Sequence, residues 1–296
     1  MLRFDENRPS DAPKDAATVL PVRSRQGEIE LFCVERHRAS GFLGGAVVFP
    51  GGKLSAADRA GEWQAHTTGL GARELAVAED PDTCRAFAVA ALRELFEEAG
   101  ILPVAGAPLD DARVEALRME LTRRSEASGD DARAFFELCR DERLALDTSA
   151  LTTFARWITP KAESRRYDTR FYLLACPTAQ SGRHDEHETT SSFWATPREL
   201  LRRWSAEEIF LAPPTLRSIE LFAGAHDIES ARVLARGQSL TPLCPFFVQH
   251  EGASVLALPG DPLYFEAAPA PADPAAPTRF VLEGSRFVPQ RVTREG

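Results

Sequence analysis

Short apolar runs separated by polar turns predict β-strands along much of the chain. They cover residues 16–22, 29–34, 46–49, 154–158, 170–175 and 191–194. The turn between the first two runs is at Gln26-Gly27, and the third run ends at Pro50-Gly51-Gly52. Near the C-terminus, residues 279–282 and 286–289 flank Glu283-Gly284-Ser285, which predicts a hairpin.

Helical periodicity dominates four other segments. Apolar residues recur at helical spacing over 84–99, and residues 110–146 are rich in Ala, Arg, Glu and Leu, which favours two or three helices. Residues 197–204 and 213–222 begin with proline, a residue suited to the first turn of a helix. Residues 267–277 alternate Ala and Pro and are typical of a semi-rigid spacer.

The helix predicted over 84–99 has an unusual distribution of charge. At about 100° per residue, Glu94, Glu97 and Glu98 share one arc, and the apolar residues lie on the adjacent face. Like charges at this spacing destabilise a helix, and two of the acids lie in the last turn, where the helix dipole disfavours them. Gly100 then ends the helix as a C-cap. A hard divalent cation such as Mg²⁺ or Mn²⁺ would reverse the sign of these effects.

A run of acids is ordinarily a solvated helix face, and the residues upstream weaken that interpretation without removing it. Phe49-Pro50-Gly51-Gly52 ends a predicted strand with two glycines, which let the backbone turn sharply and approach a metal or a phosphate. A glycine turn followed by a carboxylate-bearing helix is therefore compatible with a metal or phosphate site as well as with a solvated acidic face.

Composition narrows the class of protein. The chain has 296 residues and a net charge of −9, which argues against a broad nucleic-acid-binding surface. Its five cysteines are odd in number and well separated, so we expect neither a disulfide framework nor a paired-cysteine zinc site. No secretion signal or membrane-length apolar run is visible, and we expect a cytoplasmic protein without membrane contact.

Together these residues resemble the Nudix hydrolase family, whose signature is G-x5-E-x7-R-E-U-x-E-E-x-G-U, with U a bulky aliphatic residue. Residues 93–101 match its second half completely, and Gly52 matches its start. The resemblance implies an α/β fold, an α/β/α sandwich with a mixed β-sheet. Here it would carry a helical insertion and a C-terminal extension.

The first half of the signature is interrupted. The signature places its arginine 14 positions after the first glycine, whereas Arg93 follows Gly52 by 41 positions, an excess of 27 residues. Counting forward from Gly52 gives Asp58 at the position of the first glutamate, and counting back from Arg93 gives Arg85, so neither receives a role. Glutamates of the inserted segment are alternatives, namely Glu62, Glu74 and Glu79. The inserted segment is otherwise expected to be a surface loop.

An interruption at this place resembles the Nudix branch of peroxisomal coenzyme A diphosphatases. Flanking segments fit that branch over roughly residues 15–266. We therefore divide the chain into a flexible tail (1–14), a Nudix domain (15–205) with insertions at 58–84 and 110–146, and a C-terminal helical and β extension (206–296). The extension is expected to pack on the same domain, and a homodimer is possible.

The resemblance implies metal-dependent hydrolysis of a nucleoside diphosphate linked to another moiety. Glu94, Glu97, Glu98 and a Gly52 carbonyl would bind Mg²⁺ or Mn²⁺, with Glu97 and Glu98 in the catalytic set. Gly51, Arg93 and Gly100 would be structural. Glu188, in a polar loop, is the preferred general base. The nearby His184 and His187 are candidates for additional metal ligands, although exposed loop histidines usually have no role in a site.

Small-molecule phosphate recognition requires cations, and four arginines in the resembling segments are candidates. They are Arg36, Arg38, Arg166 and Arg170. The first-choice substrate is coenzyme A or an acyl-coenzyme A, which would give 3′,5′-ADP and phosphopantetheine or its acyl form. The alternatives are a diphosphatase acting on NADH or ADP-ribose, and a Nudix-fold regulatory protein that binds nucleotides without turnover.

Overall fold

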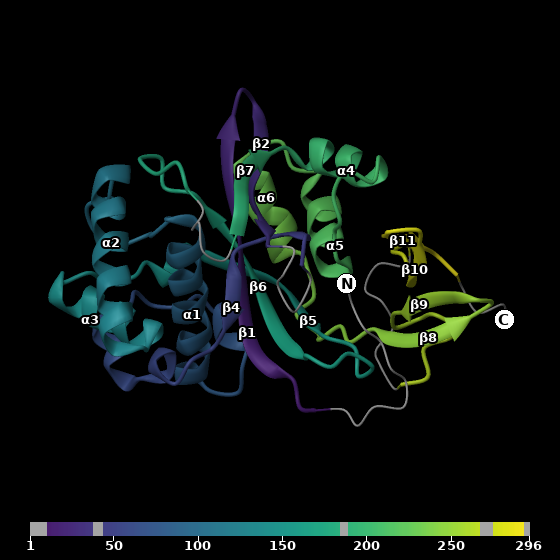
Figure 1. Cartoon of the computed structure of the whole chain (residues 1–296), viewed down its shortest axis with the longest axis horizontal. Helices are drawn as coiled ribbons and strands as arrows, with labels where there is room; N and C mark the ends of the chain where they lie inside the picture. The colour runs from purple at the N-terminus through teal and green to yellow at the C-terminus, as the bar shows by residue number, and fades with distance from the viewer. Residues whose placement is uncertain (1–10, 38–43, 184–188, 267–274, 293–296) are drawn as a thin grey trace.

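The computed structural model describes residues 11–37, 44–183, 189–266 and 275–292. A mixed sheet lies at the centre of the molecule (Figure 1). Within the described chain it has seven strands in the order β3-β2-β1-β6-β5, with β4 paired to β1 and β7 to β2. Their bounds are Lys14–Arg25 (β1), Glu28–Arg36 (β2), Val47–Val48 (β3), Gly51–Lys53 (β4), Leu151–Ile158 (β5), Tyr167–Ala175 (β6) and Thr189–Ala195 (β7). The β1–β6 pair is parallel, and the other pairs are antiparallel.

Strand β1 shows why the sheet is covered on both sides. Successive side chains of a strand point to opposite faces. Val19 belongs to one apolar core, whereas Leu20 and Val22 belong to the other. All three side chains are fully buried. The strand therefore separates two cores.

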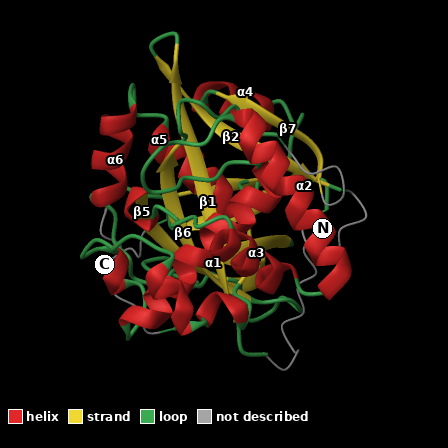
Figure 2. Cartoon of the chain, turned by 90° about the vertical axis from the view of Figure 1, so that its left-hand side faces the viewer, coloured by secondary structure: helices red, strands yellow, loops and turns green. Residues whose placement is uncertain are grey.

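Helices fill both faces of the sheet (Figures 1 and 2). Helices α1 (Pro81–Ala99), α2 (Asp111–Ser128) and α3 (Asp131–Asp141) contribute to the first core. Helices α4 (Pro197–Ser205), α5 (Pro213–Phe222) and α6 (Ile228–Arg236) contribute to the second. The predicted α/β/α sandwich with a mixed sheet is confirmed. No helix in the described ranges is both long and apolar enough to cross a membrane.

A second, antiparallel sheet follows α6. In the described part of the chain its order is β11-β10-β9-β8. Its strands are Phe246–His250 (β8), Ala253–Ala257 (β9), Arg279–Glu283 (β10) and Arg286–Gln290 (β11). The hairpin of β10 and β11 was predicted, but α6, β8 and β9 were not. Buried side chains of this sheet, including Phe247 and Phe287, join the second core.

The segment that interrupts the signature is folded into the core, so the expectation of a simple surface loop is wrong. It forms three short 3-10 helices, Ala57–Arg59, Gly61–Ala65 and Glu74–Ala76. Trp63 is fully buried and packs against Phe135 and Phe136 of α3, with ring centroids 5.8 and 5.0 Å away. The guanidinium of Arg73 donates to backbone carbonyls of β5 and of the segment around the end of α6. The inserted segment thus holds the helical insertion and the sheet together.

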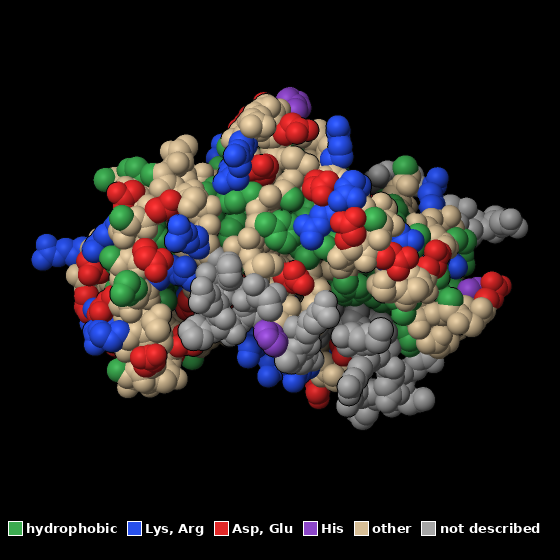
Figure 3. Space-filling model, turned by 45° about the horizontal axis from the view of Figure 1, so that its top comes forward, with side chains coloured by type: hydrophobic (Ala, Val, Ile, Leu, Met, Phe, Trp, Pro, Cys, Tyr) green, Lys and Arg blue, Asp and Glu red, His purple; other side chains and the backbone are tan. Residues whose placement is uncertain are grey.

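The outer surface of α2 and α3 carries many ion pairs. Arg124 contacts both Glu120 and Asp141, at 2.7 and 2.8 Å, and Arg123 also contacts Glu120. Acidic and basic side chains are interspersed over these helices on the face shown in Figure 3. Exposed pairs of this kind contribute at most about 1 kcal/mol each. The helical insertion is therefore held mainly by its buried apolar side chains.

Replacing Trp63 by phenylalanine tests this role of the inserted segment. The change removes indole packing and the hydrogen bond from Trp63 Nε1 to the Ala57 carbonyl, which is 3.0 Å long. We expect the free energy of unfolding to fall by about 1–2 kcal/mol, measured by urea denaturation. Trp204→Phe is the matched control, since Trp204 Nε1 has no hydrogen-bond partner among the described residues. Equal losses in the two variants would contradict the prediction.

Candidate active site

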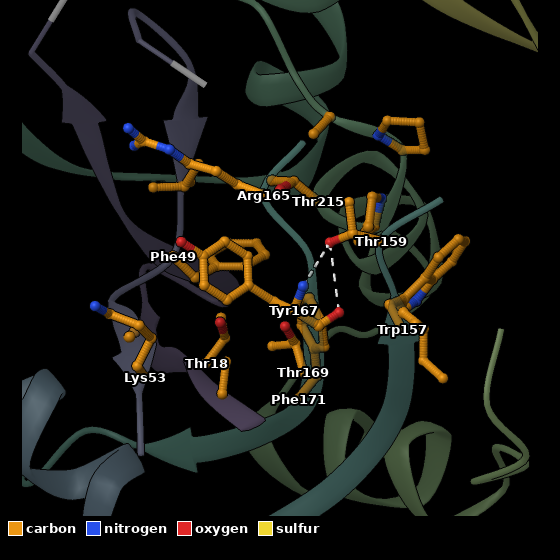
Figure 4. Close-up of a pocket in the computed structure, with 18 of the residues that line it drawn as sticks. Thr18, Phe49, Lys53, Trp157, Thr159, Arg165, Tyr167, Thr169, Phe171 and Thr215 are labelled. Carbon is orange, nitrogen blue, oxygen red and sulfur yellow. Dashed lines mark hydrogen bonds between the residues drawn. The ribbon is translucent and has the colours of Figure 1, made fainter. Parts of the chain in front are cut away.

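A cavity of about 450 Å³ opens beside the central sheet (Figure 4). Its walls come from β4 and α1, from the facing ends of β5 and β6, from the start of α5, and from β9 of the small sheet. It contains carboxylates, cations and apolar side chains, so its parts have different chemistry.

Helix α1 brings the carboxylates to this cavity. The helix begins after Asp80, whose side chain accepts a hydrogen bond from Thr83 N, and proline occupies its first position. Gly100 ends it with a φ of 59°, as the sequence predicts. Nearly the whole apolar face of the helix is buried, and Glu94 and Glu98 from the adjacent face line the cavity.

The glycine turn lies directly against these carboxylates. Gly51 N donates to Glu98 Oε2 at 2.9 Å. A β-carbon at Gly52 would overlap the carboxylate of Glu94, and one at Gly51 would overlap the backbone of β1. Gly51 is therefore required by its close approach to the backbone of β1, whereas a side chain at Gly52 would displace the Glu94 carboxylate. The strand β4 that the two glycines begin holds the turn against β1.

Glu97 is placed differently from Glu94 and Glu98. It is not among the described residues that line the cavity, and its Oε2 accepts a hydrogen bond from Arg93 at 3.0 Å. Its Oε1 is buried and has no partner in the described part of the chain. Burial raises the pKa of Glu97 to about 8, although Arg93 opposes this shift. Its role as a metal ligand stays a prediction.

Arg93 is the centre of a buried charge network. Its guanidinium makes two hydrogen bonds to Asp58, both 2.9 Å long, and further bonds to Glu94, Glu97 and the Lys53 carbonyl. Burial alone would lower the pKa of Arg93, but the surrounding carboxylates raise it above its ordinary value. The arginine thus orients both Glu94 and Glu97.

The partner of Arg93 answers a question that the sequence left open. Asp58 is the residue found by counting forward from Gly52. Its side chain is completely buried and forms an ion pair with Arg93. Arg85, found by counting back, pairs instead with the exposed Asp82. The alternative Glu74 accepts a hydrogen bond from Thr153 N, and Glu62 and Glu79 are exposed. Of these described candidates, Asp58 is the one that contacts Arg93.

Three cationic side chains line the cavity in the described chain: Arg36, Lys53 and Arg165. Arg36 was predicted, and its Nε is buried with no hydrogen-bond partner among the residues described. Lys53 was not predicted, although its position directly after the glycine turn indicates a cation near the site. Arg165 precedes β6, and its side chain and that of Lys53 extend toward the same side of the cavity (Figure 4).

Two other predicted arginines hold the fold together, which revises their expected role in substrate binding. Arg170 is buried against the ring of Phe87, contacts Asp168 at 3.0 Å, and donates to the Val77 carbonyl. Burial lowers its pKa. Arg166 donates to the carbonyls of Asp11 and Thr159. Neither is among the described residues that line the cavity.

The remaining predicted site residues lie outside the described part of the chain. They are Arg38, the general-base candidate Glu188, and the two loop histidines, His184 and His187.

The donor chemistry at the glycine turn fits a divalent metal ion. Among the described residues no three His, Cys, Asp or Glu side chains form a ready metal cluster. Mg²⁺, however, is typically held by one or two carboxylates together with substrate phosphates and water. Glu94 and Glu98 face the cavity, and the poorly solvated carboxyl of Glu97 is joined to Glu94 through Arg93. These hard oxygen donors suit such an ion.

The family model and the curated relatives that match this chain carry the same name. The family model described as the NUDT19 Nudix domain matches residues 72–221. Acyl-coenzyme A diphosphatase NUDT19 of Gallus gallus is 30% identical over 191 residues, which cover 50% of each chain. The Homo sapiens protein of the same name is 31% identical over 160 residues, covering 44% of this chain and 43% of its own. The chain thus spans about half the length of the curated relatives it matches.

Among solved structures, a NUDIX hydrolase from Alicyclobacillus acidocaldarius is similar in both sequence and fold. It is 28% identical, with a TM-score of 0.65, and the match covers 78% of this chain and 99% of the other. The similarity therefore extends well beyond the segment that carries the signature.

Proposed function

The chain belongs to the Nudix family, in the branch described by the NUDT19 Nudix domain, and from this membership we propose that it hydrolyses the diphosphate bond of coenzyme A or an acyl-coenzyme A. The products would be 3′,5′-ADP and phosphopantetheine or its acyl form. The observation that carries the proposal is the pair of Glu94 and Glu98, placed against the glycine turn in a cavity that also contains cations. The names of the relatives support the choice of substrate.

The residues of the cavity have two different roles in the proposed reaction, metal binding and phosphate binding. Glu94 and Glu98, with the Gly52 carbonyl, would hold Mg²⁺ or Mn²⁺, which when bound offsets negative charge on the diphosphate. Lys53, Arg36 and Arg165 would bind the phosphate oxygens, because charged donors make strong hydrogen bonds to them.

The bond changes are those of a simple hydrolysis. A water oxygen bonds to one phosphorus, the phosphorus–oxygen bond to the bridging oxygen breaks, and that oxygen leaves on the other phosphate. The water loses its proton to a base, for which Glu188 stays the prediction. Arg93 keeps Glu94 oriented through their 2.9 Å hydrogen bond. The cytoplasmic location and the possible homodimer also stay predictions.

A substrate panel tests the proposal. We expect the purified protein to hydrolyse coenzyme A and acyl-coenzyme A with Mg²⁺ or Mn²⁺, with 3′,5′-ADP appearing in the chromatogram. Rates with NADH, ADP-ribose and nucleoside triphosphates, and rates after chelation with EDTA, are the controls. Preferential hydrolysis of NADH or ADP-ribose would overturn the choice of substrate, and no turnover of any compound would overturn the enzymatic function.

A further inference from the structure

The cavity has two chemically different ends. The glycine turn, Lys53 and the carboxylates of α1 lie at one end. Trp157 lies on the opposite side of the cavity from Lys53, with Tyr167 between them (Figure 4). The end of β5 that carries Trp157 and Ile158 is joined to residue 243, because Ile158 N donates to the Leu243 carbonyl. That contact brings Pro245 and the small sheet to the same side.

The end around Trp157 is mainly apolar, although the side chains of Thr159 and Thr215 also line the cavity. Its described lining comes from the end of β5, the first turn of α5 and the small sheet: Trp157, Ile158, Pro160, Pro213, Pro214, Pro245 and Leu256. Four of these seven residues are prolines, which have no backbone N–H, so the wall offers few hydrogen-bond donors. A rigid apolar wall of this kind excludes water and suits an apolar ligand group.

The polar side chains near this end, Thr159 and Thr215, are too few to replace the hydrogen bonds of a sugar or to select a base. Thr159 Oγ1 already accepts a hydrogen bond from Tyr167 N at 3.1 Å and contacts the Tyr167 carbonyl (Figure 4). A ribose buried here would lose hydrogen bonds to water from its hydroxyls without replacement, which is unfavourable. A base edge likewise needs directional donors and acceptors to be selected.

The proposed substrate has an apolar group beside its diphosphate. In the pantetheine arm, a quaternary carbon with two methyl groups lies one methylene from the phosphate oxygen. The corresponding position in ADP-ribose or NADH is a hydroxylated ribose. A cavity whose charged end binds the diphosphate and whose other end is apolar therefore distinguishes these substrates by the group next to the phosphate.

We infer that the apolar wall formed by β5, the start of α5 and the small C-terminal sheet is a specificity subsite for the branched aliphatic arm attached to the diphosphate. The inference rests on the proposed function and deepens it. It gives the C-terminal sheet a direct part in substrate choice, since Pro245 and Leu256 complete the wall. The adenosine part of the substrate then lies outside this subsite.

Direct binding of the two product halves tests the subsite without relying on turnover. Pro214 is half-buried, lines the cavity, and occupies the second position of α5, where tryptophan is tolerated in a helix. The Kd values of 4′-phosphopantetheine, 3′,5′-ADP and ribose 5-phosphate are measured by calorimetry with Mg²⁺ for the wild type and Pro214→Trp. Val233→Trp on the exposed face of α6 is the matched control, because its side chain is 61% exposed.

We expect wild-type protein to bind 4′-phosphopantetheine more tightly than ribose 5-phosphate. Pro214→Trp should raise the ratio of the 4′-phosphopantetheine Kd to the 3′,5′-ADP Kd by at least about tenfold, whereas Val233→Trp should not. Thermal unfolding of both variants confirms that they are folded, and Pro214→Ala replaces Pro214→Trp if the latter is not, with a smaller change in the same direction.

Three results would overturn the inference. Selective loss of 3′,5′-ADP binding would mean that the base occupies the apolar end. An unchanged ratio would mean that the wall does not contact either half. Tighter wild-type binding of ribose 5-phosphate would mean that the end accepts a sugar. If 4′-phosphopantetheine binds as expected but coenzyme A is not hydrolysed, the proposed function fails and the subsite stands.

Discussion

Glu98→Gln should lower kcat for coenzyme A by at least about 100-fold, because it removes one of the two carboxylates that would hold the divalent metal ion, and that ion offsets the negative charge on the diphosphate. Glu98 is 5% exposed and lines the cavity beside Gly51. A glutamine oxygen can still accept the hydrogen bond from Gly51 N, so the turn and the helix should keep their positions. The loss should therefore be one of activity rather than of folding.

Initial rates at saturating coenzyme A over a range of Mg²⁺ concentrations measure this effect, and thermal unfolding checks the fold. Glu229→Gln is the matched control, since the Glu229 side chain is 64% exposed on α6, away from the cavity. If Glu98→Gln kept the wild-type kcat, the assignment of Glu98 to the reaction would be wrong.

Asp58→Asn should lower both stability and activity. The Asp58 side chain is completely buried and the Arg93 side chain is 5% exposed, so the pair is shielded from water. Removing one partner of such a pair leaves a buried charge uncompensated, which costs about 3–5 kcal/mol. Glu94 and Glu97 still contact Arg93, which places the expected loss near the lower end of this range.

The activity of Asp58→Asn should fall because Arg93 also orients Glu94. Guanidinium-chloride unfolding gives the change in stability, and kcat and KM for coenzyme A give the change in activity. Asp82→Asn removes the same charge from a side chain that is 81% exposed and serves as the control. If Asp58→Asn were as stable and as active as Asp82→Asn, the proposed role of Asp58 as the anchor of Arg93 would be contradicted.

The sequence predicts the fold where local pattern and long-range packing agree. The amphipathic helix α1, its glycine cap and the β10–β11 hairpin all have strong local signals. Helix α6 and strands β8 and β9 were missed because their segments are short and mix polar with apolar residues. Their stability comes from packing on the second core, which no local window contains.

The site was predictable where the backbone itself fixes the geometry. The glycine turn and the spacing of Glu94 and Glu98 were enough to predict that they meet. The separate position of Glu97 depends on Arg93 and Asp58, which interact across the inserted segment. An arginine that pairs with a buried carboxylate of the protein stabilises the fold and is not available to a substrate. Asp168 forms such a pair with Arg170 and not with Arg165.

The parallel pairing of β1 with β6 has a consequence for how the chain acquires its structure. Lys14 pairs with Tyr167 and Val22 with Ala175, so residues 26–166 form the connection between two adjacent central strands. Closing so long a loop is entropically costly, and contacts between distant residues form late. During synthesis, β1 cannot pair with β6 until more than half of the chain has left the ribosome. The locally stabilised helices of the intervening segment have that interval in which to form.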